Sequence, residues 1–469
     1  MIFSFLLFLG LFAVIGLSSV LRSRGTKQDY YLASSSIHPA LVGLSAVATN
    51  NSGYMFIGVI GYTYNTGWAS IWLMIGWISG DYFSSLFVHS RLRAATERTK
   101  EVSYAGVLSQ WNGRQGYLLG RMIALVSLFF LLAYASAQLV AGSKALHVLF
   151  GWPEWVGAVI GAVLVMLYCI AGGIRASIWT DAAQSIVMIV AMGLMLVMAT
   201  NSMGGINSSI SQMNQIDGFM NWFPKDLIFP GIAGGLFFAV SWAFAGLSVI
   251  GQPHIMVRFM ALNDNSKMKQ AKQWYYLFFI IFYLLATGVG MLSRIYLSDP
   301  GTFDPELALP TMAQQLLHPY LVGLVLAGVF AATMSTADSL ILSCSSALTY
   351  DLLPHKIENT LILKAGTALI TLIALAWALF NKQSVFSLVV MAWSGLASAF
   401  APLLIVLCLG GRPSRNVSLA AMFTGLGVAL SWRYLSWHNT VYEGMPGILA
   451  GLIVLYIGIR TQNREMNVE

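Results

Sequence analysis

The chain has 469 residues, of which 57% are hydrophobic and 9% are charged, and its formal net charge is +7 at pH 7. Soluble domains carry about a quarter charged residues, so this composition excludes an ordinary soluble enzyme or scaffold. Lys and Arg are confined to short segments between apolar stretches, so the positive charge does not indicate a nucleic-acid partner. Apolar stretches of about 20 residues recur along the chain, which predicts an all-α polytopic protein embedded in a lipid bilayer.

The first apolar stretch, residues 2–21, is followed rather than preceded by basic residues. A secretory signal has the opposite order, so we expect a retained transmembrane helix. About twelve further spans follow, which gives about thirteen in all. They are expected near residues 38–62, 67–89, 116–147, 153–171, 178–200, 228–256, 273–293, 317–350, 361–381, 384–410, 414–433 and 445–460.

The basic residues in the loops predict the orientation of these spans. If the N-terminus is outside, most Lys and Arg residues, among them Arg114 and Lys356, fall on the inner side. Cytoplasmic loops carry an excess of Lys and Arg. The predicted topology is therefore N-out and C-in.

The second and seventh spans are predicted to be broken near the middle of the membrane. Residues 48–53 form a polar, turn-prone run, and residues 245–254 contain two Gly-rich turns and a proline. Each broken span begins a set of five, and interrupted helices in matching positions indicate an inverted-repeat transporter. Two ordinary Gly/Pro kinks remain the alternative. The predicted parts are an extra N-terminal helix (1–21), two five-helix repeats (38–200 and 228–410), and C-terminal helices with a cytoplasmic tail (411–469).

The ninth span presents small and hydroxyl residues on one face. Ala332, Ser335 and Thr336 follow at i, i+3 and i+4. A hard cation such as Na⁺ takes several oxygens. Two hydroxyls, the Ala332 carbonyl, and the carbonyls of Ala48 and Asn51 at the first break predict a sodium site with no carboxylate. Close helix packing is the alternative explanation for the small residues.

Asp338 lies beside the same face, next to Ser339, and an intramembrane carboxylate is a functional candidate by default. Asp181 begins the sixth span, and two interpretations of it are open. It is a helix N-terminal charge near the inner interface, paired with Arg175, or it faces Asp338, Ser335 and Ser339 and completes a second site for a cation or a proton. Asp81 lies nearer the inner end of its span, and we expect it to be structural.

A solute is expected to contact the first break and the helices beside it. Tyr134 and Gln138 are four residues apart and share a helix face, although polar residues in such helices also serve as interhelical contacts. Trp242 precedes the second break and is expected to form a hydrophobic wall. The candidates at the first break are Asn50, Ser52 and Gly53.

The remaining cysteine, histidine and arginine residues in apolar segments are expected to have structural or interfacial roles. Cys169, Cys344 and Cys408 lack CxxC spacing, which predicts packed, reduced thiols. His254 and Arg258 stand one turn apart at an inner helix end and are expected at the membrane interface. The histidines are scattered along the chain, which argues against a metal cluster.

Nearly the whole chain resembles the sodium:solute symporters, and within them the bacterial proline carriers. The stretches that carry the resemblance keep the family's order and are 44–46, 50–53, 168–176, 179–181, 251–254, 258–261, 334–336 and 392–395. The resemblance implies a LeuT-type core of two inverted repeats in the inner membrane of a bacterium, with Na⁺ as the coupling ion. It maps the main sodium site onto the five positions chosen above. A second sodium site of some members would fall on Asp181, Ser335, Asp338 and Ser339, with an aspartate at 338 where those members have a hydroxyl.

The resemblance says less about the solute. The proline carriers have an aspartate at the position of Asn50 and aromatic residues at those of Ala245 and Val249. The tyrosine in their third core helix, by contrast, matches Tyr134. Sugar carriers of the family have an asparagine at the Asn50 position.

The predicted function is sodium-coupled import of a small polar organic solute, first an amino acid such as proline, by alternating access. A proton-coupled carrier, a uniporter, and a sodium-coupled carrier of a sugar or small carboxylate remain alternatives. No nucleophile–base pair or cofactor loop stands out, so an enzyme is not predicted. The sequence makes no prediction about the oligomeric state.

Overall fold

The computed structural model describes residues 1–113, 116–297, 301, 304–353, 359–380 and 384–466, and these residues form helices and no β-strand. Arg114 and Lys356, which contribute to the predicted orientation, lie outside the described residues. The α-helices are α1 (Ile2–Ser18), α2 (Lys27–Leu32), α3 (Pro39–Gly53), α4 (Val59–Thr66), α5 (Ile71–Ser85), α6 (Val88–Thr99), α7 (Tyr104–Gln110), α8 (Tyr117–Phe150), α9 (Glu154–Ser202), α10 (Ile206–Asn214), α11 (Gly231–Leu247), α12 (Pro253–Met260), α13 (Met268–Tyr296), α14 (Ala308–Leu316), α15 (Pro319–Ser346), α16 (Thr360–Phe380), α17 (Val385–Cys408), α18 (Arg415–Tyr434) and α19 (Gly444–Met466).

Within the described chain, nine helices are long and apolar enough to cross a membrane, and a bent pair, Pro39–Ser85 with Val88–Thr99, raises this to ten. Two of these segments are too long for one crossing. The 49 residues of α9 extend roughly 74 Å, whereas the hydrocarbon core is about 30 Å thick. Gly173 divides α9 with φ 56° and ψ −142°. The run Pro39–Ser85 likewise contains the second and third predicted spans, and α18 occupies the twelfth, so every predicted span coincides with helical structure.

The predicted break of the second span is confirmed. Ser52, near the end of α3, has φ 30° and ψ 176°, which no helix contains. A π-helical turn, Tyr54–Gly58, follows before α4 begins. The helical hydrogen-bond ladder is therefore interrupted, and backbone groups on both sides of Ser52 must find other partners.

The seventh span is also broken, as predicted. Its outer half, α11, runs into a 3₁₀ turn, Ser248–Gly251. Gln252 then adopts the extended conformation, with φ −100° and ψ 101°. Pro253 begins the inner half, α12, because proline lacks an N–H and suits the first turn of a helix.

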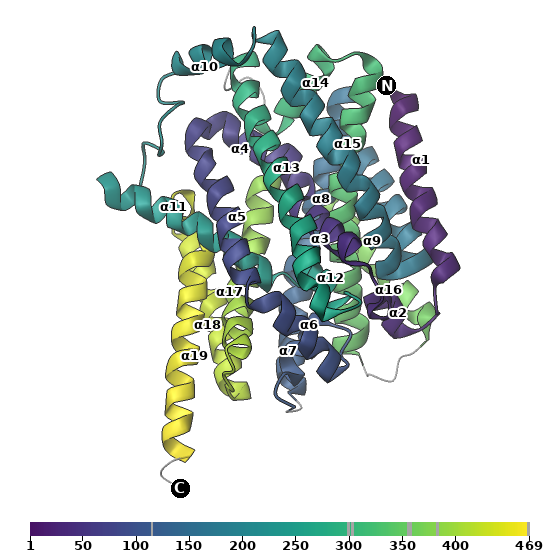
Figure 1. Cartoon of the computed structure of the whole chain (residues 1–469), viewed down its shortest axis with the longest axis vertical. Coiled ribbons are helices and arrows are strands. Elements are labelled where there is room, and N and C mark those ends of the chain that lie inside the picture. Colours follow the sequence, from purple (N-terminus) through teal and green to yellow (C-terminus); the bar gives the residue numbers. More distant parts are fainter. Residues whose placement is uncertain (114–115, 298–300, 302–303, 354–358, 381–383, 467–469) are drawn as a thin grey trace.

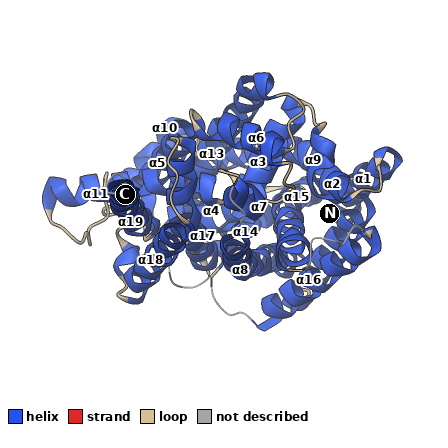
Figure 2. Cartoon of the chain, turned by 90° about the horizontal axis from the view of Figure 1, so that it is seen from below, coloured by secondary structure: helices blue, strands red, loops and turns tan. Residues whose placement is uncertain are grey.

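The broken spans lie inside a bundle whose centre is formed by α15 and α17. In the most apolar stretch of each of these two helices, 83% of the residues are buried, compared with 28% for α1 and for α19. Figures 1 and 2 show α1 and α19 on opposite sides of the bundle. The N- and C-termini lie at opposite ends of the molecule in Figure 1, in agreement with the N-out, C-in topology.

The short helix α2 is tied to α9 by an ion pair that the sequence did not predict. The guanidinium of Arg175 lies 2.6 Å from the carboxylate of Asp29, and both side chains are nearly fully buried. Burial raises the pKa of Asp29, but the backbone N–H of Arg24 and the guanidinium of Arg175 outweigh it and hold the pKa below its ordinary value of 3.8. The interpretation that pairs Arg175 with Asp181 is therefore wrong.

Candidate functional site

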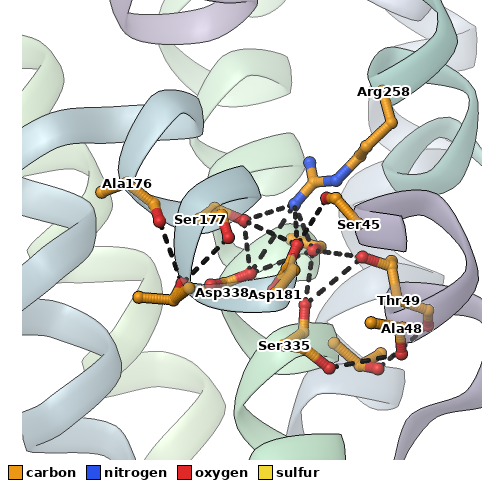
Figure 3. Close-up of polar contacts among 12 residues, drawn as sticks. Ser45, Ala48, Thr49, Ala176, Ser177, Asp181, Arg258, Ser335 and Asp338 are labelled. Atoms are coloured by element: carbon orange, nitrogen blue, oxygen red, sulfur yellow. Dashed lines mark hydrogen bonds and ion pairs between the residues drawn. The ribbon is translucent and has the colours of Figure 1, made fainter. Parts of the chain in front are cut away.

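The backbone groups that the first break releases are bonded by α15 (Figure 3). The Ser335 hydroxyl donates to the carbonyl of Ala48 at 3.2 Å, and the Thr336 hydroxyl donates to that of Thr49 at 2.9 Å. In a continuous helix these carbonyls would accept from the N–H groups four residues later. The Ser335 hydroxyl also lies 3.1 Å from the carbonyl of Ala332. Hydroxyls and carbonyls from two distant segments thus form one buried cluster.

Asn51 stands next to this cluster in α3. It is buried, and neither atom of its side-chain amide has a hydrogen-bond partner among the described residues. Buried amides are normally satisfied, so an orphaned amide beside freed carbonyls is a place for a polar or charged ligand. The donor set suits Na⁺, which prefers carbonyl and hydroxyl oxygens.

The two predicted residues of α8 contact the same break. The hydroxyl of Tyr134 donates to the hydroxyl of Ser52 at 3.2 Å. The side-chain oxygen of Gln138 accepts from the backbone N–H of Gly53 at 2.9 Å. The break is therefore bonded from α8 as well as from α15, and four predicted solute residues lie together.

Asn50 faces the opposite way, toward α13. Its side-chain nitrogen donates to the hydroxyl of Tyr275 at 2.6 Å, and this hydroxyl donates to the carboxylate of Asp81 at 2.7 Å. The remaining amide oxygen of Asn50 has no partner among the described residues. Tyr275 was missed at the sequence level, because nothing in its own segment distinguishes it from other aromatic residues of an apolar helix.

The two predicted solute residues of α11 lie in an aromatic layer. Trp242 packs edge-on against Tyr62, with ring centroids 5.9 Å apart. The carbonyl of Ala245 accepts from the indole N–H of Trp393 at 3.0 Å, and the ring of Trp393 lies 6.3 Å from that of Tyr134. Trp393 therefore connects the second break to α8. The sequence marked its segment only as part of a motif.

The structure separates the two interpretations of Asp181. This residue is fully buried, and its carboxylate accepts from the hydroxyl of Ser45 at 2.6 Å. The hydroxyl of Ser177 lies 3.5 Å from Asp181 and donates to the carboxylate of Asp338 at 2.8 Å. Ser339 also donates to Asp338, at 2.9 Å. The interpretation that Asp181, Asp338 and Ser339 face one another is the one that the geometry bears out.

The expected interfacial position of His254 and Arg258 is wrong. Both residues have no exposed surface, because α12 begins at a break within the bundle rather than near its end. Arg258 lies 3.6 Å from Asp181 and 3.7 Å from Asp338. The available signal was a charged residue flanked by apolar ones in a broken span, which marks a buried functional position.

A cavity of about 1410 Å³ lies among the ends of α6, α8, α17 and α18. None of the predicted site residues lines this cavity. The first break is instead closed over by side chains, since its residues 50–53 are all buried.

Two broken spans in a bundle of membrane-crossing helices, each bonded across the break by other helices, define a transporter of the LeuT type. The model of the family described as "Sodium:solute symporter family" matches residues 30–425. The chain therefore belongs to the sodium:solute symporter family.

Individual relatives agree with this assignment. The chain is 29% identical over 448 residues to the high-affinity proline transporter PutP of Bacillus subtilis, covering 92% of this chain and 93% of that protein. It is 30% identical over 454 residues to the sodium/proline symporter of Escherichia coli, covering 93% and 88% of the two chains. The chain is thus a sodium-coupled solute symporter of the cytoplasmic membrane rather than an enzyme.

Solved structures confirm the fold. The chain is similar to a Na⁺-coupled sialic acid symporter in a substrate-bound outward-open state, with a TM-score of 0.82 at 17% identity over 98% of this chain and 96% of that one. It is also similar to Mhp1, a nucleobase-cation-symport-1 family transporter, with a TM-score of 0.61 at 13% identity over 92% and 94% of the chains.

Proposed function

We propose that Ala48, Asn51, Ala332, Ser335 and Thr336 bind the coupling Na⁺. The observation that carries this proposal is that the hydroxyls of Ser335 and Thr336 donate to carbonyls freed by the first break. These oxygens already converge, so the ion needs only a small rotation of the hydroxyls to replace their hydrogen bonds. The orphaned amide of Asn51 supports the same position.

The proposed solute is an amino acid, with proline first because the relatives named above carry proline. Its carboxylate would be received by the unwound backbone of the first break, beside Gly53, whose N–H is held in place by Gln138. The proposed solute contacts are Asn50, Ser52, Gly53, Tyr134, Gln138, Trp242 and Ala245. Asn50, which stands where the proline carriers have an aspartate, is the position at which specificity is most open to change.

Transport is proposed to follow from movement between two repeats, residues 38–200 and 228–410, with 1–21 and 411–469 outside them. The main sodium site takes oxygens from the first broken span and from α15, one in each proposed repeat. A ligand shifts a conformational equilibrium only through its different affinities for the two states. A site shared between the moving parts meets that requirement.

The buried pair Asp181 and Asp338, with Ser339, is proposed as a second cluster that holds positive charge, and Arg258 lies 3.6 and 3.7 Å from the two carboxylates. Two carboxylates without exposed surface need positive charge nearby. A proton bound to this pair would make the carrier proton-coupled. The burial of two carboxylates side by side is the observation that favours this alternative function.

The test is uptake into proteoliposomes of radiolabelled proline, other amino acids, sugars and small carboxylates, with a sodium gradient, a pH gradient or neither. We expect sodium-driven accumulation of one compound. Accumulation driven by the pH gradient alone would replace sodium by a proton, and equilibration without any gradient would indicate a uniporter.

A variant sharpens the sodium assignment. Ser335→Ala with Thr336→Ala removes two ion ligands, and at about 1.5 kcal/mol for each charge-assisted contact the sodium needed for half-maximal uptake should rise about a hundredfold. Ser343→Ala, two turns along the same helix, is the matched control. Equal sodium dependence in the two variants would refute the site.

A further inference from the structure

One nitrogen of the Arg258 guanidinium points into a cage of carboxylate and hydroxyl oxygens (Figure 3). Its Nη2 atom lies 3.6 Å from Oδ2 of Asp181 and 3.7 Å from Oδ1 of Asp338. The same nitrogen donates to the hydroxyl of Ser177 at 2.5 Å and to the hydroxyl of Ser339. All five side chains have no exposed surface.

The guanidinium is not paired in the way that is usual for arginine. Arg and a carboxylate commonly form two parallel hydrogen bonds. Here Nε and Nη1 of Arg258 have no hydrogen-bond partner in the described part of the chain, and neither have Oδ1 of Asp181 and Oδ2 of Asp338. A single NH₂ group faces more acceptor oxygens than it has hydrogens. Two carboxylate and two hydroxyl oxygens, which are the ligand types that a hard cation prefers, thus face one nitrogen of a positively charged group.

The positive charge in this cage belongs to a side chain of the protein and comes from a different helix than the cage oxygens. Arg258 belongs to α12, the half-helix after the second break, whereas the cage oxygens come from α9 and α15. The guanidinium both occupies the space between the carboxylates and repels another cation at contact distance. A sodium ion therefore does not fit between Asp181 and Asp338 while Arg258 is in place.

We propose that the guanidinium of Arg258 is a tethered cation that fills the second site, so that the protein binds one Na⁺ instead of two. This inference rests on the proposed main site, which supplies that one ion. A charge fixed to the chain is not released into the cytoplasm, so the second site adds nothing to the driving force. It stabilises the carboxylates that would otherwise recruit a second ion.

The cage is joined to the proposed main site. The hydroxyl of Ser339 lies 2.6 Å from the carbonyl of Ser335 and 3.0 Å from the hydroxyl of Thr49. Arg258 therefore contacts the residue that follows the main-site pair by one helical turn. This contact makes the inner half-helix, α12, sensitive to events at the first break.

The test counts sodium ions bound at equilibrium, with ²²Na⁺ as the probe and without any solute. Purified full-length protein is titrated in nanodiscs at alkaline pH, where protons compete least. We expect one ion per wild-type chain, none for Ser335→Ala with Thr336→Ala, and two for Arg258→Gln. Arg258→Lys keeps the charge and should bind one.

Two further variants locate the added ion. Combining Arg258→Gln with Ser335→Ala and Thr336→Ala should leave one ion, bound in the cage. Combining Arg258→Gln with Asp338→Ala, which removes a carboxylate of the cage and offers no oxygen in its place, should weaken the added ion at least tenfold.

The outcomes separate this inference from the proposed function. A wild-type chain that binds no sodium refutes the main site. A wild-type chain that binds two ions overturns the tethered cation without the use of any variant, so the test stands even if Arg258→Gln fails to fold. A third outcome also overturns the tethered cation. If the wild-type chain binds one ion that is lost in Asp338→Asn but kept in Ser335→Ala with Thr336→Ala, the bound ion lies in the cage.

Discussion

Replacing Gln138 by leucine should weaken sodium and solute binding together. The Gln138 side chain has no exposed surface, and its oxygen is the acceptor of the Gly53 N–H at the first break. Leucine has nearly the same volume, so packing is retained, but the N–H is left buried without a partner. Such a group costs about 1–3 kcal/mol.

This cost falls on the broken conformation, which is the state proposed to bind both ligands. Lowering the population of a binding-competent state lowers the apparent affinity for every ligand of that state by the same factor. A cost of 1–3 kcal/mol corresponds to a loss of about 5- to 150-fold.

The assay is ²²Na⁺ binding and proline uptake by the variant, with Gln184→Leu as the control. Gln184 is an equally buried glutamine of α9, and neither atom of its amide has a hydrogen-bond partner among the described residues. The reasoning would be refuted if Gln138→Leu bound sodium as well as Gln184→Leu. A loss of solute affinity alone would make Gln138 a direct solute contact that does not support the break.

Tyr275→Phe removes the hydroxyl that joins Asn50 to a buried carboxylate, so we expect a loss of about 1–3 kcal/mol in unfolding free energy and weaker solute binding. The control is Tyr283→Phe, because the hydroxyl of Tyr283 has no partner among the described residues. Equal thermal-unfolding curves and equal half-saturation in the two variants would contradict this. The pKa of Asp29 is lowered from 3.8, so its ion pair stabilises the fold fully above that pH and ever less as the pH falls through the lowered value. Asp29→Asn should cost about 3–5 kcal/mol near neutrality, and unfolding temperatures of the two proteins should converge in acid; a constant difference would contradict the pairing.

The fold was largely predictable because a bilayer imposes simple local rules. Apolar stretches of sufficient length marked every span, and clusters of turn-forming residues marked both breaks at Ser52 and Gln252. Contacts between distant segments were not predictable. One of the two interpretations of Asp181 paired it with Arg175, but Arg175 pairs with Asp29, on a short helix that apolarity does not reveal.

The candidate site residues also fall into those that a local sequence pattern predicts and those that depend on contacts between distant segments. The hydroxyl face of α15 is a periodic pattern, so Ser335 and Thr336 could be selected from sequence, and their role as sodium ligands stays a prediction. Arg258 was placed at the membrane interface although the break before it was predicted, because the depth at which the inner half-helix begins is not visible in the sequence. Once the span is broken, α12 starts inside the bundle, and a residue near its inner end is still surrounded by other helices.

The arrangement of the first break offers a physical route for coupling. The carbonyls of Ala48 and Thr49 are now occupied by hydroxyls of α15, while the N–H of Gly53 is occupied by α8. If Na⁺ binds these oxygens as proposed, the hydroxyl donors must turn away, and the short segment around Ser52 must adjust between two fixed helices. The solute is proposed to contact that same segment, so the two ligands compete for, or share, one backbone conformation. Because the bonding helices belong to different proposed repeats, any rocking motion changes the sodium and solute sites in a single step, which is the condition for symport rather than two independent leaks.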